Sequence, residues 1–173
     1  MRIALYQPDI PQNAGTLMRL GACLNVGIDI IEPCGFVLDD KRLRRSGMDY
    51  LEGVDLVRHT SWAAFETRRR ANGQSGGDAG QPRPKQGAAQ GALMPRLLLL
   101  TTRAAVCYTD FVFQSDDILL LGRESAGVPE EVHTAADARL AIPMRPGLRS
   151  LNVAMAAAMV VGEAIRQLDA WPR

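Results

Sequence analysis

Residues 121–129 read LGRESAGVP and residues 142–152 read IPMRPGLRSLN. Each segment directly follows a short apolar run, at 118–121 and 139–142, which we interpret as a buried strand. In an open α/β sheet, ligands bind beyond the carboxyl ends of the strands, and glycine there lets the backbone come close to a ligand. The two segments therefore predict a ligand pocket at the carboxyl edge of such a sheet.

Strand-like and helix-like segments alternate along the rest of the chain. Strands are expected at 3–6, 28–32, 54–57, 96–101, 118–121 and 139–142. Helices are expected at 14–24, capped by Asn13, at 41–45, at 62–70, from about 129, and at 150–168, capped by Ser150. This alternation is typical of an α/β fold in which a mostly parallel sheet is flanked by helices on both faces.

The length and composition are those of one globular domain spanning residues 1–173. The hydrophobic share is 47%, and the formal net charge of +1 means that a nucleic-acid partner would have to bind a local basic patch. Residues 71–92 contain no large apolar side chain and are interpreted as a flexible insertion. The N-terminus lacks a signal-peptide core, and the longest apolar run, 153–161, is too short to cross a membrane. We therefore expect a cytoplasmic protein without membrane contact.

The first candidate motif follows the first expected strand. Asn13 at a helix start leaves backbone N–H groups pointing at whatever binds above that strand, and Arg19 lies further along the same helix. Taken alone, the two residues favour a capped helix with a solvated arginine. Residues 122–129 lack both the G-x-G-x-x-G pattern and the P-loop lysine, which disfavours a nicotinamide dehydrogenase. A plain strand-to-helix turn stays open for that segment.

The expected C-terminal helix, 150–168, begins with an almost wholly apolar run. A helix that is apolar all round has to be buried all round, whereas a sheet in a small domain covers only one side of it. This favours a homodimer through the helix. Its methionines are also compatible with simple core filling.

Basic side chains gather in short stretches, at 41–45 and 68–70, and near the predicted pocket. They suit a phosphodiester backbone better than a small neutral substrate, although such runs are usually solvated faces. His59 and His133 have no ligand-spaced partners, so we expect structural or surface roles for them and no metal site.

The order and content of these motifs resemble those of the SPOUT class of RNA ribose methyltransferases. The matching patterns are N-x-G-x-x-x-R at 13–19, G-x-E-x-x-G-V-P at 122–129, I-P-M at 142–144 and S-L-N-V at 150–153. The likeness covers nearly the whole chain except 71–92 and is greater to the small single-domain branch that methylates the ribose of the wobble nucleotide of certain tRNAs. Residues 31–36 and 39–50 also look like that branch.

The resemblance implies a C-terminal deep trefoil knot, an obligate homodimer and S-adenosyl-L-methionine bound in the knot. The residues at the family's cofactor positions are Leu100, Gly122, Ile142 and Ser150, with Met144 and Leu151 lining the same pocket. Arg19 matches the family arginine near the reacting ribose, and Asn13, Glu124 and Asn152 lie at motif positions around it. The expected RNA-binding residues are Arg42, Arg45, Arg123 and Arg149.

The expected reaction is methyl transfer to the ribose 2'-hydroxyl of wobble nucleotide 34, a cytidine or modified uridine in the anticodon loop, with leucine tRNAs as the expected substrates. This chemistry requires positioning and loss of the hydroxyl proton. A guanidinium is a poor base because it is normally protonated, so Arg19 is either an unusually perturbed base or an orienting, phosphate-binding group. Two alternatives stay open: the same chemistry on another tRNA or rRNA nucleotide, and a catalytically silent RNA-binding dimer.

Overall fold

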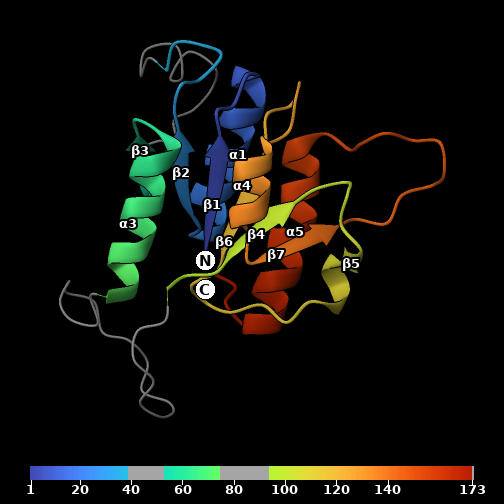
Figure 1. The fold of residues 1–173 in the computed structure, drawn as a ribbon. Helices are drawn as coiled ribbons and strands as arrows, with labels where there is room; N and C mark the ends of the chain where they lie inside the picture. Colours follow the sequence, from blue (N-terminus) through green and yellow to red (C-terminus); the bar gives the residue numbers. More distant parts are fainter. Residues whose placement is uncertain (39–52, 75–93, 173) are drawn as a thin grey trace.

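A computed structural model describes residues 1–38, 53–74 and 94–172 of the chain, which are built around one seven-stranded sheet (Figure 1). The strands are β1 (Arg2–Tyr6), β2 (Gly27–Ile31), β3 (Leu56–His59), β4 (Leu97–Leu100), β5 (Val106–Cys107), β6 (Ile118–Leu121) and β7 (Ala138–Ala141). Their order is β3-β2-β1-β6-β4-β7-β5, and every pairing is parallel. The predicted α/β class with a parallel sheet is confirmed.

Helices cover both faces of the sheet. They are α1 (Pro11–Leu24), α3 (Trp62–Gln74), α4 (Glu130–Ala135) and α5 (Val153–Leu168), and a 3-10 turn, η2, spans Tyr108–Asp110. The buried side chains of α1 and α5 form one apolar cluster with one face of the sheet. Those of α3 and α4 form a second cluster on the opposite face. Figure 1 shows α3 and α5 on opposite sides of the strands.

Apart from Arg2 at the start of β1, the central strands β1, β6 and β4 are apolar because both of their faces are covered. In β1, Ile3 and Leu5 belong to the cluster with α1 and α5, whereas Ala4 and Tyr6 belong to the cluster with α3 and α4. Parallel strands buried on both sides characteristically form continuous apolar runs instead of alternating patterns. This explains why short uninterrupted runs are the clearest strand signals in this sequence.

Both predicted helix caps are wrong. α1 begins at Pro11 with Ile10 as its N-cap, because proline lacks the N–H group that the first helical position would leave unpaired. Asn13 therefore lies inside the first turn. α5 begins at Val153, and its cap is Asn152 instead of Ser150.

Other boundaries shift by a few residues. The third strand is found at 56–59, where 54–57 was expected, and α3 continues to Gln74, so the first residues of the predicted insertion at 71–92 are helical. β5 and η2 were not predicted; both are very short and carry little periodic signal. The helix expected at 41–45 and the rest of the insertion, to residue 92, lie outside the described residues. The trefoil knot stays a prediction.

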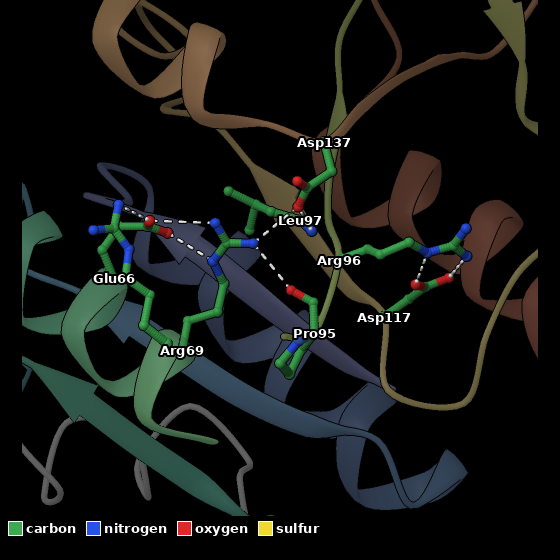
Figure 2. A network of polar contacts seen from close by, with 8 residues as sticks. Glu66, Arg69, Pro95, Arg96, Leu97, Asp117 and Asp137 are labelled. Carbon is green, nitrogen blue, oxygen red and sulfur yellow. Dashed lines mark hydrogen bonds and ion pairs between the residues drawn. The ribbon is translucent and has the colours of Figure 1, made fainter. Parts of the chain in front are cut away.

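A network of ion pairs ties α3 to the amino ends of β4 and β7 (Figure 2). The buried Arg69 side chain donates to Glu66 Oε1 at 2.8 Å, to the Pro95 carbonyl at 3.0 Å and to Asp137 Oδ2 at 2.9 Å. The same Asp137 oxygen accepts from the Leu97 N–H group at 2.7 Å. One arginine thus joins a helix to the starts of two neighbouring strands.

We expect Arg69→Met to lower the free energy of unfolding by about 3 kcal/mol, because it leaves two carboxylates without their buried partner. Arg70→Met is the matched control: Arg70 pairs with the same Glu66 but its side chain is 68% exposed, so its loss should cost under about 1 kcal/mol. Urea unfolding followed by circular dichroism measures both. Equal effects of the two substitutions would contradict the assignment of the network to Arg69.

Candidate functional site at the carboxyl edge of the sheet

A cavity of about 480 Å³ lies where β4 and β6 end. Its wall comes from five segments: the start of α1, the ends of β4 and β6 with the residues that follow them, the loop after β7, and the start of α5. Its lining residues are Ile10, Asn13, Leu99, Leu100, Thr101, Thr102, Leu121, Gly122, Arg123, Glu124, Gly127, Val128, Ile142, Met144, Ser150, Leu151, Asn152, Val153 and Ala156. The volume is within the usual range for small-molecule sites, roughly 300–1,000 Å³.

The loop after β6 is a tight turn closed on itself. Arg123 and Gly127 exchange backbone hydrogen bonds of 3.0 and 2.8 Å, and Gly127 has a left-handed φ of 68°. A Cβ on Gly122 would lie 2.7 Å from the Gly127 carbonyl carbon, closer than packed atoms allow. Both glycines are therefore required by the turn itself, beside any role of Gly122 toward a ligand.

A directional chain of side-chain hydrogen bonds crosses the cavity wall. Asn152 Nδ2 donates to Asn13 Oδ1 at 2.9 Å, and Asn13 Nδ2 donates to Glu124 Oε1 at 3.0 Å. Glu124 Oε2 accepts from the Asp9 N–H group at 3.1 Å. This series of hydrogen bonds joins the segments that follow β1, β6 and β7.

The cap of α5 sets the direction of this chain. Asn152 Oδ1 accepts from the N–H groups of Ala154 at 2.9 Å and Met155 at 3.3 Å. Its amide nitrogen must therefore face Asn13, which in turn presents its oxygen to Asn152 and its nitrogen to Glu124. The last acceptor in the series is a carboxylate, which accepts through both oxygens.

The predicted cofactor residues all line the cavity. They are Leu100, Gly122, Ile142, Met144, Ser150 and Leu151. The predicted catalytic residues Asn13, Glu124 and Asn152 line it as well, and their side chains bond to one another. The first motif lies more than a hundred residues before the others in the sequence, yet Asn13 meets them in one place.

The predicted cationic residues are more dispersed. Arg123 lines the cavity and its guanidinium lies 5.7 Å from the centre of the Tyr6 ring. Arg149 is exposed on the loop before α5, and Arg19 is exposed on α1 and is not among the lining residues. Arg42 and Arg45 lie outside the described residues.

Both histidines have side-chain partners. The buried His59 places Nε2 2.6 Å from Asp29 Oδ1, and His133 Nδ1 accepts from Arg139 Nε at 3.1 Å. Within the described ranges no group of three or more His, Cys, Asp or Glu side chains could hold a metal ion. None of the helices there is both long and apolar enough to cross a membrane.

The start of α5 has an exposed apolar face outside the cavity. Met155 is 65% exposed and Met159 is 42% exposed, whereas Ala157, Val160 and Val161 are fully buried in the core. The helix is therefore not covered on all sides within one chain. That arrangement fits the expectation of a partner molecule against this face.

Several cavity residues were not predicted from the sequence. Ile10, Thr101, Thr102 and Ala156 all line the cavity. The rule that ligands bind beyond the carboxyl ends of parallel strands points to the two threonines, which directly follow β4. Ala156 carries no such signal, since only the docking angle of α5 brings it to the wall.

We expect Asn13→Asp to destabilise the protein by about 2 kcal/mol at pH 8, because a carboxylate would replace the amide that donates to Glu124. Two adjacent carboxyl groups raise one pKa, so the folded state binds more protons than the unfolded chain and stability recovers as pH falls toward 5. Urea unfolding at both pH values measures this. Gln12 is an exposed neighbour on the same helix, so Gln12→Glu should show neither effect. A loss of stability in Asn13→Asp that does not depend on pH would contradict the hydrogen bond from Asn13 to Glu124.

Comparison with known proteins identifies relatives over almost the whole chain. A model of the SpoU rRNA Methylase family matches residues 1–75 and 92–162. A tRNA (cytidine(34)-2'-O)-methyltransferase from Beijerinckia indica is 55% identical, covering 97% of this chain and 92% of its own. The protein of that name from Escherichia coli K12 is 38% identical, with 97% and 94% coverage.

Solved structures agree with the sequence relatives. A structure described as giving insights into the 2-OH methylation of C/U34 on tRNA has a TM-score of 0.79 at 36% identity, covering 97% of this chain and 95% of its own. The SpoU methyltransferase AviRb from Streptomyces viridochromogenes, in complex with the cofactor AdoMet, has a TM-score of 0.75 at 26% identity, covering 98% of this chain and 60% of its own. The resemblance seen in the motifs is confirmed, and the chain belongs to the SpoU methylase family.

Proposed function

We propose that this protein is an S-adenosylmethionine-dependent methyltransferase that modifies the ribose 2'-hydroxyl of wobble nucleotide 34 of tRNA, in the cytoplasm. The observation that carries the proposal is the cavity at the carboxyl edge, where the three motif segments meet. Relatives named for this reaction, at 55% and 38% identity over nearly full length, support the choice of nucleotide.

The cavity suits the cofactor in size and in the kind of side chain that lines it. Bound S-adenosylmethionine would supply a methyl group activated on a positively charged sulfonium. The strand ends offer an apolar floor, while the 122–127 turn brings backbone groups to the wall. The residues that would hold the cofactor are Leu100, Gly122, Ile142, Met144, Ser150 and Leu151. The carboxylate of Glu124, on the same wall, favours a cationic ligand over a neutral one.

The polar residues of the site divide into two roles. Asn13, Glu124 and Asn152 bond to one another, so we assign them to holding the loops in place. Arg19, exposed on α1, is assigned to orienting the substrate through its phosphodiester backbone, since a guanidinium stays protonated. Arg123 and Arg149, with Arg42 and Arg45, would complete a basic path for the anticodon loop.

Arg19→Ala should abolish methyl transfer while leaving S-adenosylmethionine binding unchanged, because Arg19 lies outside the cavity lining. Arg19→Lys keeps the charge but loses the planar fork, and we expect only partial recovery. Transfer of a labelled methyl group to unmodified tRNA measures activity, and calorimetry measures binding. Normal turnover in Arg19→Ala would remove Arg19 from the mechanism.

Mass spectrometry of ribose-methylated nucleosides, from cells with and without the protein, tests the substrate. Loss of methylation at nucleotide 34, with leucine tRNAs as the expected carriers, supports the proposal. Loss at an rRNA or other tRNA nucleotide would instead favour the same chemistry on another target. This is the second candidate, because the matching family is the SpoU rRNA Methylase family. No change in any ribose methylation, together with retained tRNA binding, would favour a silent RNA-binding protein.

We further propose that a second copy of the chain covers the exposed face of α5. Met159→Glu should convert a dimer to a monomer in size-exclusion chromatography with light scattering, because burying a carboxylate against an apolar face is unfavourable. Val106→Glu is the matched control, since Val106 is 44% exposed against 42% for Met159 but lies on the edge strand β5. A wild-type protein that stays monomeric at micromolar concentration would overturn the dimer.

A further inference from the structure

Asp9 joins two loops that are far apart in the sequence. It lies between β1 and α1, next to Ile10 but not itself among the cavity-lining residues. Its Oδ1 accepts from the Glu124 N–H group at 3.1 Å, and its Oδ2 accepts from the Ser125 N–H group at 3.3 Å and from the Ser125 hydroxyl. In return, the Asp9 N–H group donates to Glu124 Oε2 at 3.1 Å. One carboxylate therefore receives two successive backbone N–H groups of the turn after β6.

The position of Asp9 is constrained from its other side as well. A Cβ on Gly35 would lie 2.8 Å from Asp9 Cβ, so the loop after β2 packs directly against the aspartate. The Gly35 N–H group also donates to the Pro8 carbonyl at 2.9 Å. Hydrogen bonds with Glu124 and Ser125 lower the pKa of Asp9 to about 2, which keeps the carboxylate ionised throughout the pH range in which the protein would work.

We infer that Asp9 is a positioning residue for methyl transfer, which acts through the 122–127 turn by holding Gly122 and Glu124 where S-adenosylmethionine binds. The inference rests on the proposed function. Gly122 and Glu124 line the cavity, whereas the Arg123–Gly127 backbone pair closes only the base of the turn. The Asp9 carboxylate adds acceptors for the N–H groups of Glu124 and Ser125, which lie nearer the tip of the turn. Hydrogen bonds to an ionised acceptor are about twice as strong as neutral ones.

The test is Asp9→Asn, which keeps the shape but places an NH₂ group against N–H donors. We expect hydrogen exchange of the Glu124 and Ser125 amides, followed by NMR, to become about tenfold faster, with no change in the α5 amides. The Kd and KM for S-adenosylmethionine should rise by about tenfold, while the KM for tRNA stays unchanged. Asp9→Glu, which retains the carboxylate, should recover part of the affinity.

Two further variants make the result decisive. Asp116→Asn is the matched control, because Asp116 is exposed at the amino end of β6, opposite the end that carries the turn; it should behave as wild type. Ser125→Ala removes only the hydroxyl that donates to Asp9 and tests the same contact if Asp9→Asn does not fold. It should weaken S-adenosylmethionine binding relative to the wild type, and wild-type affinity in Ser125→Ala would overturn the inference where Asp9→Asn does not fold.

The outcomes separate the inference from the function on which it rests. Wild-type affinity and wild-type amide exchange in Asp9→Asn would overturn the role of Asp9 and leave the proposed function standing. Faster amide exchange with unchanged affinity would show that the turn is held but is not what binds the cofactor, which also overturns the inference. Failure of the wild-type protein to bind S-adenosylmethionine would overturn the proposed function, and the role of Asp9 with it.

Discussion

The hydrogen-bond chain from Asn152 through Asn13 to Glu124 is the interaction on which the site depends. Parallel strands send all their carboxyl ends to one edge of the sheet, so the loops after β1, β6 and β7 emerge at the same edge, with β4 between β6 and β7. Asparagine can donate and accept through one side chain. Because Asn152 accepts at the cap of α5, it donates to Asn13, and Asn13 in turn donates to the carboxylate of Glu124.

The same edge explains the unusual composition of the first part of α5, which is wholly apolar from Val153 to Val161. Its first turn contributes Val153 and Ala156 to the cavity wall. Its buried face, including Val160, fills the core against α1 and the sheet, and its third face exposes Met155 and Met159. Three different surfaces thus require apolar residues on one helix, and the proposed dimer contact would lie directly beside the proposed cofactor site.

Stability and function are concentrated at opposite ends of the strands. At the amino ends of β4 and β7, the buried Arg69 and its carboxylates fasten α3 to the sheet (Figure 2). At the carboxyl ends, the side chains of Asn13, Glu124 and Asn152 bond to one another in the wall of the cavity. The residues of this ion-pair network are not among those that line the cavity.

The sequence by itself determined the α/β class, most of the strands and part of the cavity lining, because runs such as Ile118–Leu121 and the glycines that follow them are local signals. The tertiary structure decided the roles of the polar residues. Asparagine is a residue type that favours helix caps, but Asn13 instead donates a hydrogen bond to Glu124. Nothing near Asp9 in the sequence indicates its contacts with Ser125. A hydrogen bond between residues more than a hundred positions apart depends on how strands are ordered in the sheet, and that order is set by the packing of the whole chain.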